Sequence, residues 1–176
     1  MAGLLPGIAQ TRLGATVDME GWRSDYDVGS RAADPYTRAR IARHGLLALA
    51  RTEAVYFTRT KDDDGAPLRE TCSYRVSGGT MPAEWWSLTL YDARSRLPAN
   101  SDAALSIDAS RVSGARWEAQ IAPRRPANGN TWISSRNADR FDLMLRLYVP
   151  DAAVLETPDA TLLPPAISRL DCEGDG

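Results

Sequence analysis

The chain has 176 residues, which is the length of one domain. Hydrophobic residues make up 43% and charged residues 25%, as in ordinary globular proteins, and no apolar run reaches the roughly 18 residues that a membrane-spanning helix needs. The net charge of −2 lacks the basic excess of nucleic-acid-binding proteins, and a single histidine with two cysteines excludes a His/Cys metal cluster. We therefore expect no metal, no cofactor and no nucleic-acid partner.

The N-terminal segment, residues 1–32, is rich in small residues and has no clear hydrophobic period. We expect an extended arm that docks on the rest of the chain through Trp22 and Tyr26. Its first ten residues, MAGLLPGIAQ, contain no basic residue and too short an apolar run for a signal peptide. Our hypothesis is that an export segment or a membrane anchor was removed before them, and that any membrane contact is through that anchor.

Residues 33–176 are expected to form a single domain that begins with a helix. Residues 34–51 show the helical spacing of apolar side chains, with Asp34 as the N-cap and Pro35 at the first helical position. His44 lies in this helix without an evident partner. We interpret it as a surface or packing residue rather than a general base or a metal ligand.

After the helix, the apolar spacing changes to the period of two that is typical of β-strands. Residues 54–60 and 69–76 predict two strands of one hairpin, with Asp62-Asp63-Asp64-Gly65 as the turn. A calcium loop is the alternative for these aspartates, but its ligand spacing is missing. Alternation along the second strand places three side chains on one face: Cys72, Tyr74 and Val76.

The strongest strand pattern is WWSLTLY, residues 85–91. Its expected core face consists of Trp86, Leu88 and Leu90, whereas the opposite face carries Trp85, Ser87, Thr89 and Tyr91. Residues 140–149 alternate as cleanly, with five apolar side chains expected inward: Phe141, Leu143, Leu145, Leu147 and Val149. Shorter strands are expected at residues 104–107, 115–122, 132–133 and 164–172. Seven or eight short strands separated by turns predict a β-sandwich or a barrel over residues 54–172.

The two cysteines, Cys72 and Cys172, are 100 positions apart and belong to no CxxC motif. They are either two reduced, buried thiols or one disulfide that ties the C-terminal segment to an early strand. Cys172 lies in the polar sequence DCEGDG, where a buried thiol is unusual, and this position favours the disulfide.

The strand series resembles a known bacterial family. The segments EAVYF, DDDGAPLRETCSYRV, MPAEWWSLTLYD, RFDLMLRLYVP and LLPPAISRL occur in the order and spacing of domain of unknown function 1214. The resemblance covers about residues 50–170, and its most recognisable parts are Trp85–Tyr91 and Leu145–Pro150.

The resemblance implies a mainly-β fold, a jelly-roll-like antiparallel β-sandwich with one flanking N-terminal α-helix. A short-chain subgroup keeps the ADPYTRA helix start and both cysteines, and tends to carry an export signal or a membrane anchor. This similarity supports the Cys72–Cys172 disulfide and a periplasmic or cell-envelope location. Because the family has no established activity, it transfers no catalytic residue.

The best candidate for a ligand site is a surface rather than a motif. Five residues combine aromatic rings with hydrogen-bonding groups: Trp85, Tyr91, Trp132, Arg146 and Tyr148. Such a face suits a sugar or an extended peptide. The alternative is that these side chains pack beneath the helix and the N-terminal arm.

We therefore expect a non-catalytic envelope module that binds a glycan or an extended peptide, or interacts with a protein. One alternative is a glycan hydrolase or lyase that uses two of the carboxylates on or near the strands: Glu70, Glu84, Glu118 and Asp142. Another is a structural subunit that self-associates through the arm. The sequence does not define the oligomeric state.

Overall fold

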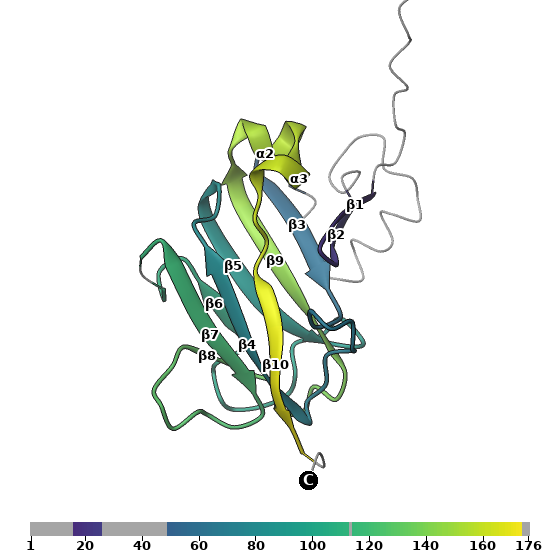
Figure 1. Ribbon diagram of the computed structural model, residues 1–176, viewed down its shortest axis with the longest axis vertical. Coiled ribbons are helices and arrows are strands. Elements are labelled where there is room, and N and C mark those ends of the chain that lie inside the picture. Colours follow the sequence, from purple (N-terminus) through teal and green to yellow (C-terminus); the bar gives the residue numbers. More distant parts are fainter. Residues whose placement is uncertain (1–15, 26–48, 113, 174–176) are drawn as a thin grey trace, which may run out of the picture.

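The computed structural model describes residues 16–25, 49–112 and 114–173, which form two β-sheets (Figure 1). The expected helix over residues 34–51 lies outside the described residues except for its last three, which are not helical. His44 and Tyr26 lie outside the described residues as well.

The larger sheet has six antiparallel strands and begins with a hairpin near the N-terminus. In spatial order its strands are β1 (Thr16–Met19), β2 (Trp22–Asp25), β3 (Ala54–Arg59), β9 (Phe141–Pro150), β5 (Ala83–Asp92) and β6 (Ser106–Asp108). Strands β5 and β9 form the longest pairing of this sheet, in register from Ala83↔Pro150 to Asp92↔Phe141.

The smaller sheet has four strands and lies across the core from the larger one (Figure 1). In order its strands are β10 (Ala166–Cys172), β4 (Cys72–Gly79), β7 (Arg116–Ala122) and β8 (Trp132–Ser134). The pairing of β7 with β8 is parallel, so the expected antiparallel pattern has one exception. Its reason is the long connection between these strands, which returns the chain to the side where β7 began.

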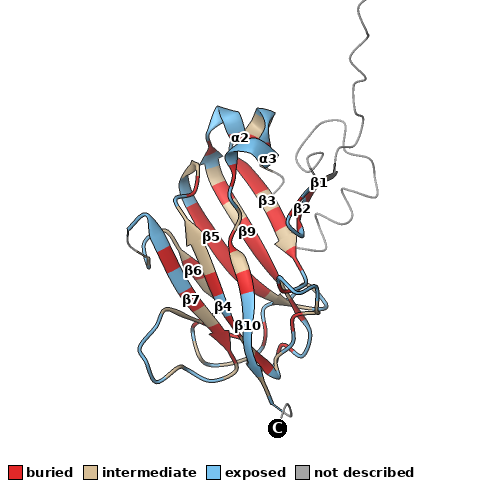
Figure 2. Ribbon diagram, in the orientation of Figure 1, coloured by how far each residue is buried: buried red, intermediate tan, exposed pale blue. Residues whose placement is uncertain are grey.

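The core lies between the sheets and is built by the alternation of side chains along each strand, visible as the buried positions in Figure 2. Trp86 of β5 stacks on Trp117 of β7 with 4.7 Å between ring centroids. Tyr74 of β4 meets Phe141 of β9 edge to face at 5.9 Å. These pairs join opposite sheets, so the mainly-β sandwich expected from the sequence is confirmed.

The expected hairpin of strands 54–60 and 69–76 is wrong. β3 and β4 belong to different sheets, and only one bridge, Lys61↔Pro67, continues beyond β3. The turn itself forms, because the Asp62 carboxylate accepts the Ala66 N–H at 2.8 Å. The Asp62 N–H donates to the Ala66 carbonyl at 2.9 Å and the Leu68 N–H to the Thr60 carbonyl at 3.0 Å, and after this short pairing the chain crosses to the other sheet.

Two further local expectations differ from the structure. Val149 is 47% exposed, because its φ of 47° breaks the alternation at the end of β9. The chain then forms two short helices that the strand pattern did not predict, α2 (Ala152–Glu156) and α3 (Pro158–Thr161).

The segment expected as an extended arm contains the β1–β2 hairpin where it is described. Trp22 docks it as expected: the side chain is fully buried and its Nε1 donates to the Pro165 carbonyl at 2.8 Å. A left-handed turn at Glu20 and Gly21 joins the two strands.

The disulfide between Cys72 and Cys172 is present. The two cysteines are partners in the β4–β10 ladder. The bond therefore fixes the last strand, β10, to its neighbour β4 at the edge of the smaller sheet. This confirms the disulfide that the position of Cys172 favoured.

Candidate functional site

Four of the five predicted ligand residues meet on the outer face of the larger sheet. Trp85 and Tyr148 are ladder partners on β5 and β9, with ring centroids 5.3 Å apart. Arg146 donates to the Tyr91 hydroxyl at 2.6 Å and to Thr89 Oγ1 at 3.1 Å. We call Trp85, Tyr91, Arg146 and Tyr148 the outer face.

Most side chains of the outer face contact one another or a neighbouring residue of the sheet. The Arg146 guanidinium also lies 5.5 Å from the centroid of the Tyr91 ring, so this cation is held against the sheet. On the neighbouring strand, burial raises the pKa of Tyr56 above its usual value and Tyr148 adds to this, whereas Arg146 opposes it. Trp85 remains the exposed part, with 41% of its surface accessible.

Trp132 is separate from the other four. It begins β8, at the edge of the smaller sheet, and its Nε1 donates to the Ala122 carbonyl at 2.9 Å. This bond fixes the orientation of the half-buried indole. The ring lines a cavity at one end of the sandwich.

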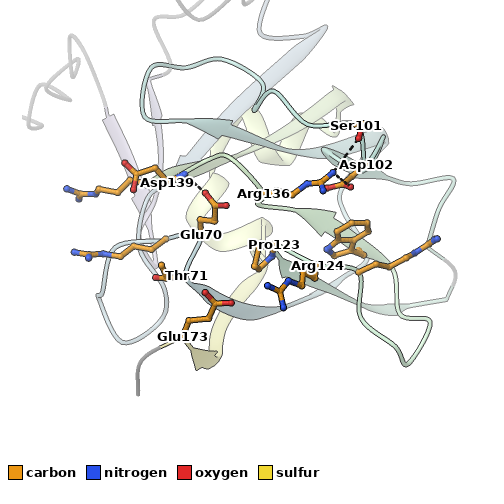
Figure 3. Close-up of a pocket in the computed structure, with 13 residues that line it drawn as sticks. Glu70, Thr71, Ser101, Asp102, Pro123, Arg124, Arg136, Asp139 and Glu173 are labelled. Carbon is orange, nitrogen blue, oxygen red and sulfur yellow. Dashed lines mark hydrogen bonds and ion pairs between the residues drawn. The ribbon is translucent and has the colours of Figure 1, made fainter. Parts of the chain in front are cut away.

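This end cavity has a volume of about 890 Å³ and is open to solvent. It is formed where β4, β8 and β9 begin and where β7 and β10 end, so its walls are strand ends and loops (Figure 3). Its lining residues are Arg69, Glu70, Thr71, Ser101, Asp102, Pro123, Arg124, Arg125, Trp132, Arg136, Asp139, Arg140 and Glu173.

Two carboxylates of the end cavity hold its loops in place. Both oxygens of Glu70 accept backbone N–H groups, from Asn137 and from Asp139, each at 2.9 Å. Asp102 accepts the Ser134 hydroxyl at 2.6 Å and forms an ion pair with Arg136. These contacts connect segments up to 69 positions apart in sequence.

The arginines of the cavity are mostly unpaired. Arg136 is held against Asp102 and Ser101, and Figure 3 shows Arg124 on the side of Pro123 and Glu173. Among the residues that the structure describes, the four other arginines of the cavity form no ion pair: Arg69, Arg124, Arg125 and Arg140. The cavity therefore presents free guanidinium groups together with an aromatic ring.

The disulfide borders the same cavity. Thr71 directly precedes Cys72, and Glu173 directly follows Cys172. The Glu173 N–H donates to the Thr71 carbonyl at 2.7 Å. Both residues line the end cavity. The bond between β4 and β10 thus holds one wall of it.

The carboxylates considered for an acid/base pair lie in different places. Of the four, only Glu70 lines the end cavity. Glu118 pairs with Arg75 at 3.5 Å in the middle of the smaller sheet. Glu84 and Asp142 lie toward opposite ends of the β5–β9 pairing.

The described residues contain no group of three His, Cys, Asp or Glu side chains that could hold a metal ion. In the same part of the chain, no helix has the length and apolar character needed to cross a membrane.

Residues 53–152 match the model of the family described as protein of unknown function (DUF1214). The chain belongs to the DUF1214 family. No curated protein matches it.

Solved structures similar to this DUF1214 chain are larger proteins. The VPA0106 protein from Vibrio parahaemolyticus shares 19% identity over 77% of this chain and 35% of its own, with a TM-score of 0.62. An uncharacterized protein from Burkholderia cenocepacia shares 16% identity over 86% of this chain and 48% of its own, with a TM-score of 0.43. The DUF1214 chain thus spans about a third and about half of their lengths.

Sequence reasoning missed the arginines of the cavity in this DUF1214 chain. A usable signal was present, because Arg124 and Arg125 stand between two prolines in a long polar loop. The chain carries 20 arginines and one lysine, and this general excess hid the few arginines that converge.

Proposed function

We propose that the chain is a non-catalytic binding module of the cell envelope, and that the end cavity binds a glycan. The observation that carries the proposal is an open cavity of about 890 Å³ in which Trp132 stands beside unpaired polar groups. Ligand sites commonly occupy about 300–1,000 Å³ and combine an apolar surface with a few oriented polar groups. A sugar ring offers an apolar face for the indole and hydroxyl groups for the surrounding donors and acceptors.

The shape of the cavity favours a glycan over an extended peptide. An extended peptide binds most simply by adding a strand along an exposed sheet edge. The end cavity is walled by strand ends and loops: β8, one edge strand of the smaller sheet, has three residues, and β10, the other, reaches the cavity only with its C-terminal end. Neither edge offers much length for a ladder there.

Binding without catalysis is supported by the state of the fixed carboxylates. Both oxygens of Glu70 and both oxygens of Asp102 already accept hydrogen bonds within the protein. A general acid or base needs an oxygen within reach of the substrate. The two carboxylates therefore serve to position loops.

An envelope location is supported by the disulfide. Such bonds form and persist in oxidising compartments, and the periplasm is one of them. The Cys72–Cys172 bond joins strands 100 positions apart, so it contributes to the fold that carries the cavity.

The test is calorimetric titration of the oxidised chain with chitotetraose, peptidoglycan disaccharide-peptides and an extended peptide of mixed sequence. We expect binding of a glycan that Trp132→Ala weakens by about tenfold or more, because an aromatic platform supplies a large part of a small site's contact. Trp132→Phe keeps a platform and should retain most of the affinity.

The matched control is Trp85→Ala, which removes an exposed tryptophan from the outer face. It should leave the affinity unchanged, with each variant checked for an unaltered melting temperature. Loss of binding in Trp85→Ala alone would place the ligand on the outer face. Binding of the peptide without any glycan would reject the proposal.

A further inference from the structure

We infer that the end cavity selects an acidic glycan, one that carries carboxylate or phosphate groups on several sugar units. This inference rests on the proposed glycan function and specifies the chemistry of the ligand. Its basis is the charge of the cavity wall, which differs from that of the whole chain.

The wall is electropositive in an acidic protein. Five arginines and four carboxylates line the cavity, whereas the chain as a whole has a net charge of −2. Two of those carboxylates, Glu70 and Asp102, are occupied by internal hydrogen bonds. The groups still available to a ligand are therefore mainly cationic.

The available cations are guanidinium groups, and their chemistry limits the class of ligand further. A guanidinium matches the two oxygens of a carboxylate or phosphate with parallel hydrogen bonds. Arg124 and Arg140 lie on different walls, after β7 and before β9, and neither forms an ion pair with any described residue. Cations on separate walls favour a ligand that carries more than one anionic group.

The size of the cavity favours such a ligand over a free anion. A single phosphate or carboxylate would occupy a small part of 890 Å³ and has no apolar face to place against the Trp132 indole. An oligosaccharide with acidic substituents reaches the indole and the arginines at once. The Arg136–Asp102 pair, tied to Ser101 and Ser134, fixes one wall against which it would bind.

The test compares three probes on the oxidised full chain by calorimetry: tetragalacturonate for carboxylates, mannopentaose phosphate for phosphate, and neutral chitotetraose. At least one acidic probe should bind about tenfold or more tightly than the neutral one, because charge-assisted hydrogen bonds are the stronger kind. Raising NaCl from about 0.05 M to about 0.5 M should weaken only the acidic probe, because salt screens exposed charges.

The variant Arg124→Gln/Arg140→Gln should weaken the acidic probe by about tenfold and leave the neutral probe unchanged. Its control is Arg94→Gln/Arg116→Gln, which removes the same charge from two exposed arginines outside the cavity. A control that weakens binding as much as the cavity variant would show general electrostatic attraction and overturn the inference.

The remaining outcomes distinguish the acidic selectivity from the proposed glycan binding. If chitotetraose binds as tightly as both acidic probes, the cavity is a neutral glycan site, so the acidic selection is wrong while the proposed function stands. If no probe binds and Trp132→Ala has no effect on any glycan, both fail. The preferred acidic probe distinguishes a carboxylated from a phosphorylated ligand.

Discussion

At the scale of single residues, the packing between the sheets depends on the absence of a side chain at Gly78. This glycine is the ladder partner of Trp117, and a Cβ built on it would lie 2.4 Å from Cζ2 of the indole. The indole cannot retreat easily, because it stacks on Trp86 and its Nε1 donates to the Gly79 carbonyl at 2.9 Å.

We predict that Gly78→Ala lowers the free energy of unfolding by about 1–3 kcal/mol, as overpacking of a filled core does. The matched control is Gly79→Ala, whose Cβ would meet nothing closer than the Ala115 carbonyl at 3.7 Å. Urea denaturation of both variants gives the comparison. Equal stability of the two variants would mean that Trp117 has room to move.

A second residue-scale prediction concerns acid stability. The pKa of the Asp108 carboxyl lies below its usual value, mainly because the Ser110 hydroxyl donates a hydrogen bond to it. Burial acts in the opposite direction, whereas the Ser110 N–H and Arg111 lower the pKa further. A carboxylate with a lowered folded pKa stabilises the protein above its unfolded pKa, and this stabilisation is lost as the pH falls through the folded value.

Melting temperatures at about pH 5 and about pH 3 should therefore differ less in Asp108→Asn than in the parent chain, because the amide does not titrate. Asp64→Asn serves as the control, since Asp64 is exposed and forms no ion pair with a described residue. An unchanged pH dependence in Asp108→Asn would show that other carboxylates control acid unfolding, such as Asp18 and Asp92, whose pKa values also lie below the usual value.

At the scale of elements, alternation of apolar and polar residues predicted most strands, because each strand buries one face. It did not predict which strands are neighbours. The turn at Asp62–Gly65 was identified from its residues, yet it links two sheets instead of closing a hairpin. A long-range contact of this turn is part of that link: the Asp63 carboxylate accepts the Ile167 N–H at 2.9 Å.

Asp63 also forms an ion pair with Arg59 at 2.7 Å, so this carboxylate connects β3 with β10. Arg59 is only 5% exposed, and loss of its partner would leave a buried cation. We predict that Asp63→Ala lowers the free energy of unfolding by about 2–4 kcal/mol. Asp64→Ala, in the same turn, should change it by about 0.5 kcal/mol or less. Similar losses of stability in the two variants would show that the turn itself, and not the contacts of Asp63, accounts for the change.

At the scale of the whole molecule, the sequence predicted the sandwich better than the site. Four predicted ligand residues share one sheet face, because alternation fixes the face on which a side chain lies. Trp132 was also predicted, but not its neighbours, since loop convergence depends on the three-dimensional path of the chain. Glu70 meets the backbone of Asn137, which is 67 positions away. No local pattern carries that information.

The last prediction follows from the position of the disulfide beside the end cavity. Thr71 and Glu173 flank the Cys72–Cys172 bond and line the cavity, so opening the bond frees one wall. The variant Cys72→Ala/Cys172→Ala should lose about 2–5 kcal/mol of stability. Where it remains folded, it should bind the glycan about fivefold or more weakly, which is a modest coupling energy.

Coupling between two equilibria is reciprocal, so bound glycan should in turn make the disulfide harder to reduce. Thiol titration against a dithiothreitol series, with and without the glycan at the same concentration, measures this shift, and Trp132→Ala should reduce it because this variant binds the glycan more weakly. Two results together would contradict this coupling: unchanged glycan binding in the folded double variant, and a reduction curve that the glycan does not shift. They would show that the disulfide stabilises the sheet without shaping the cavity. The same titration under denaturing, non-reducing conditions should find no free thiol, because both cysteines are in the bond.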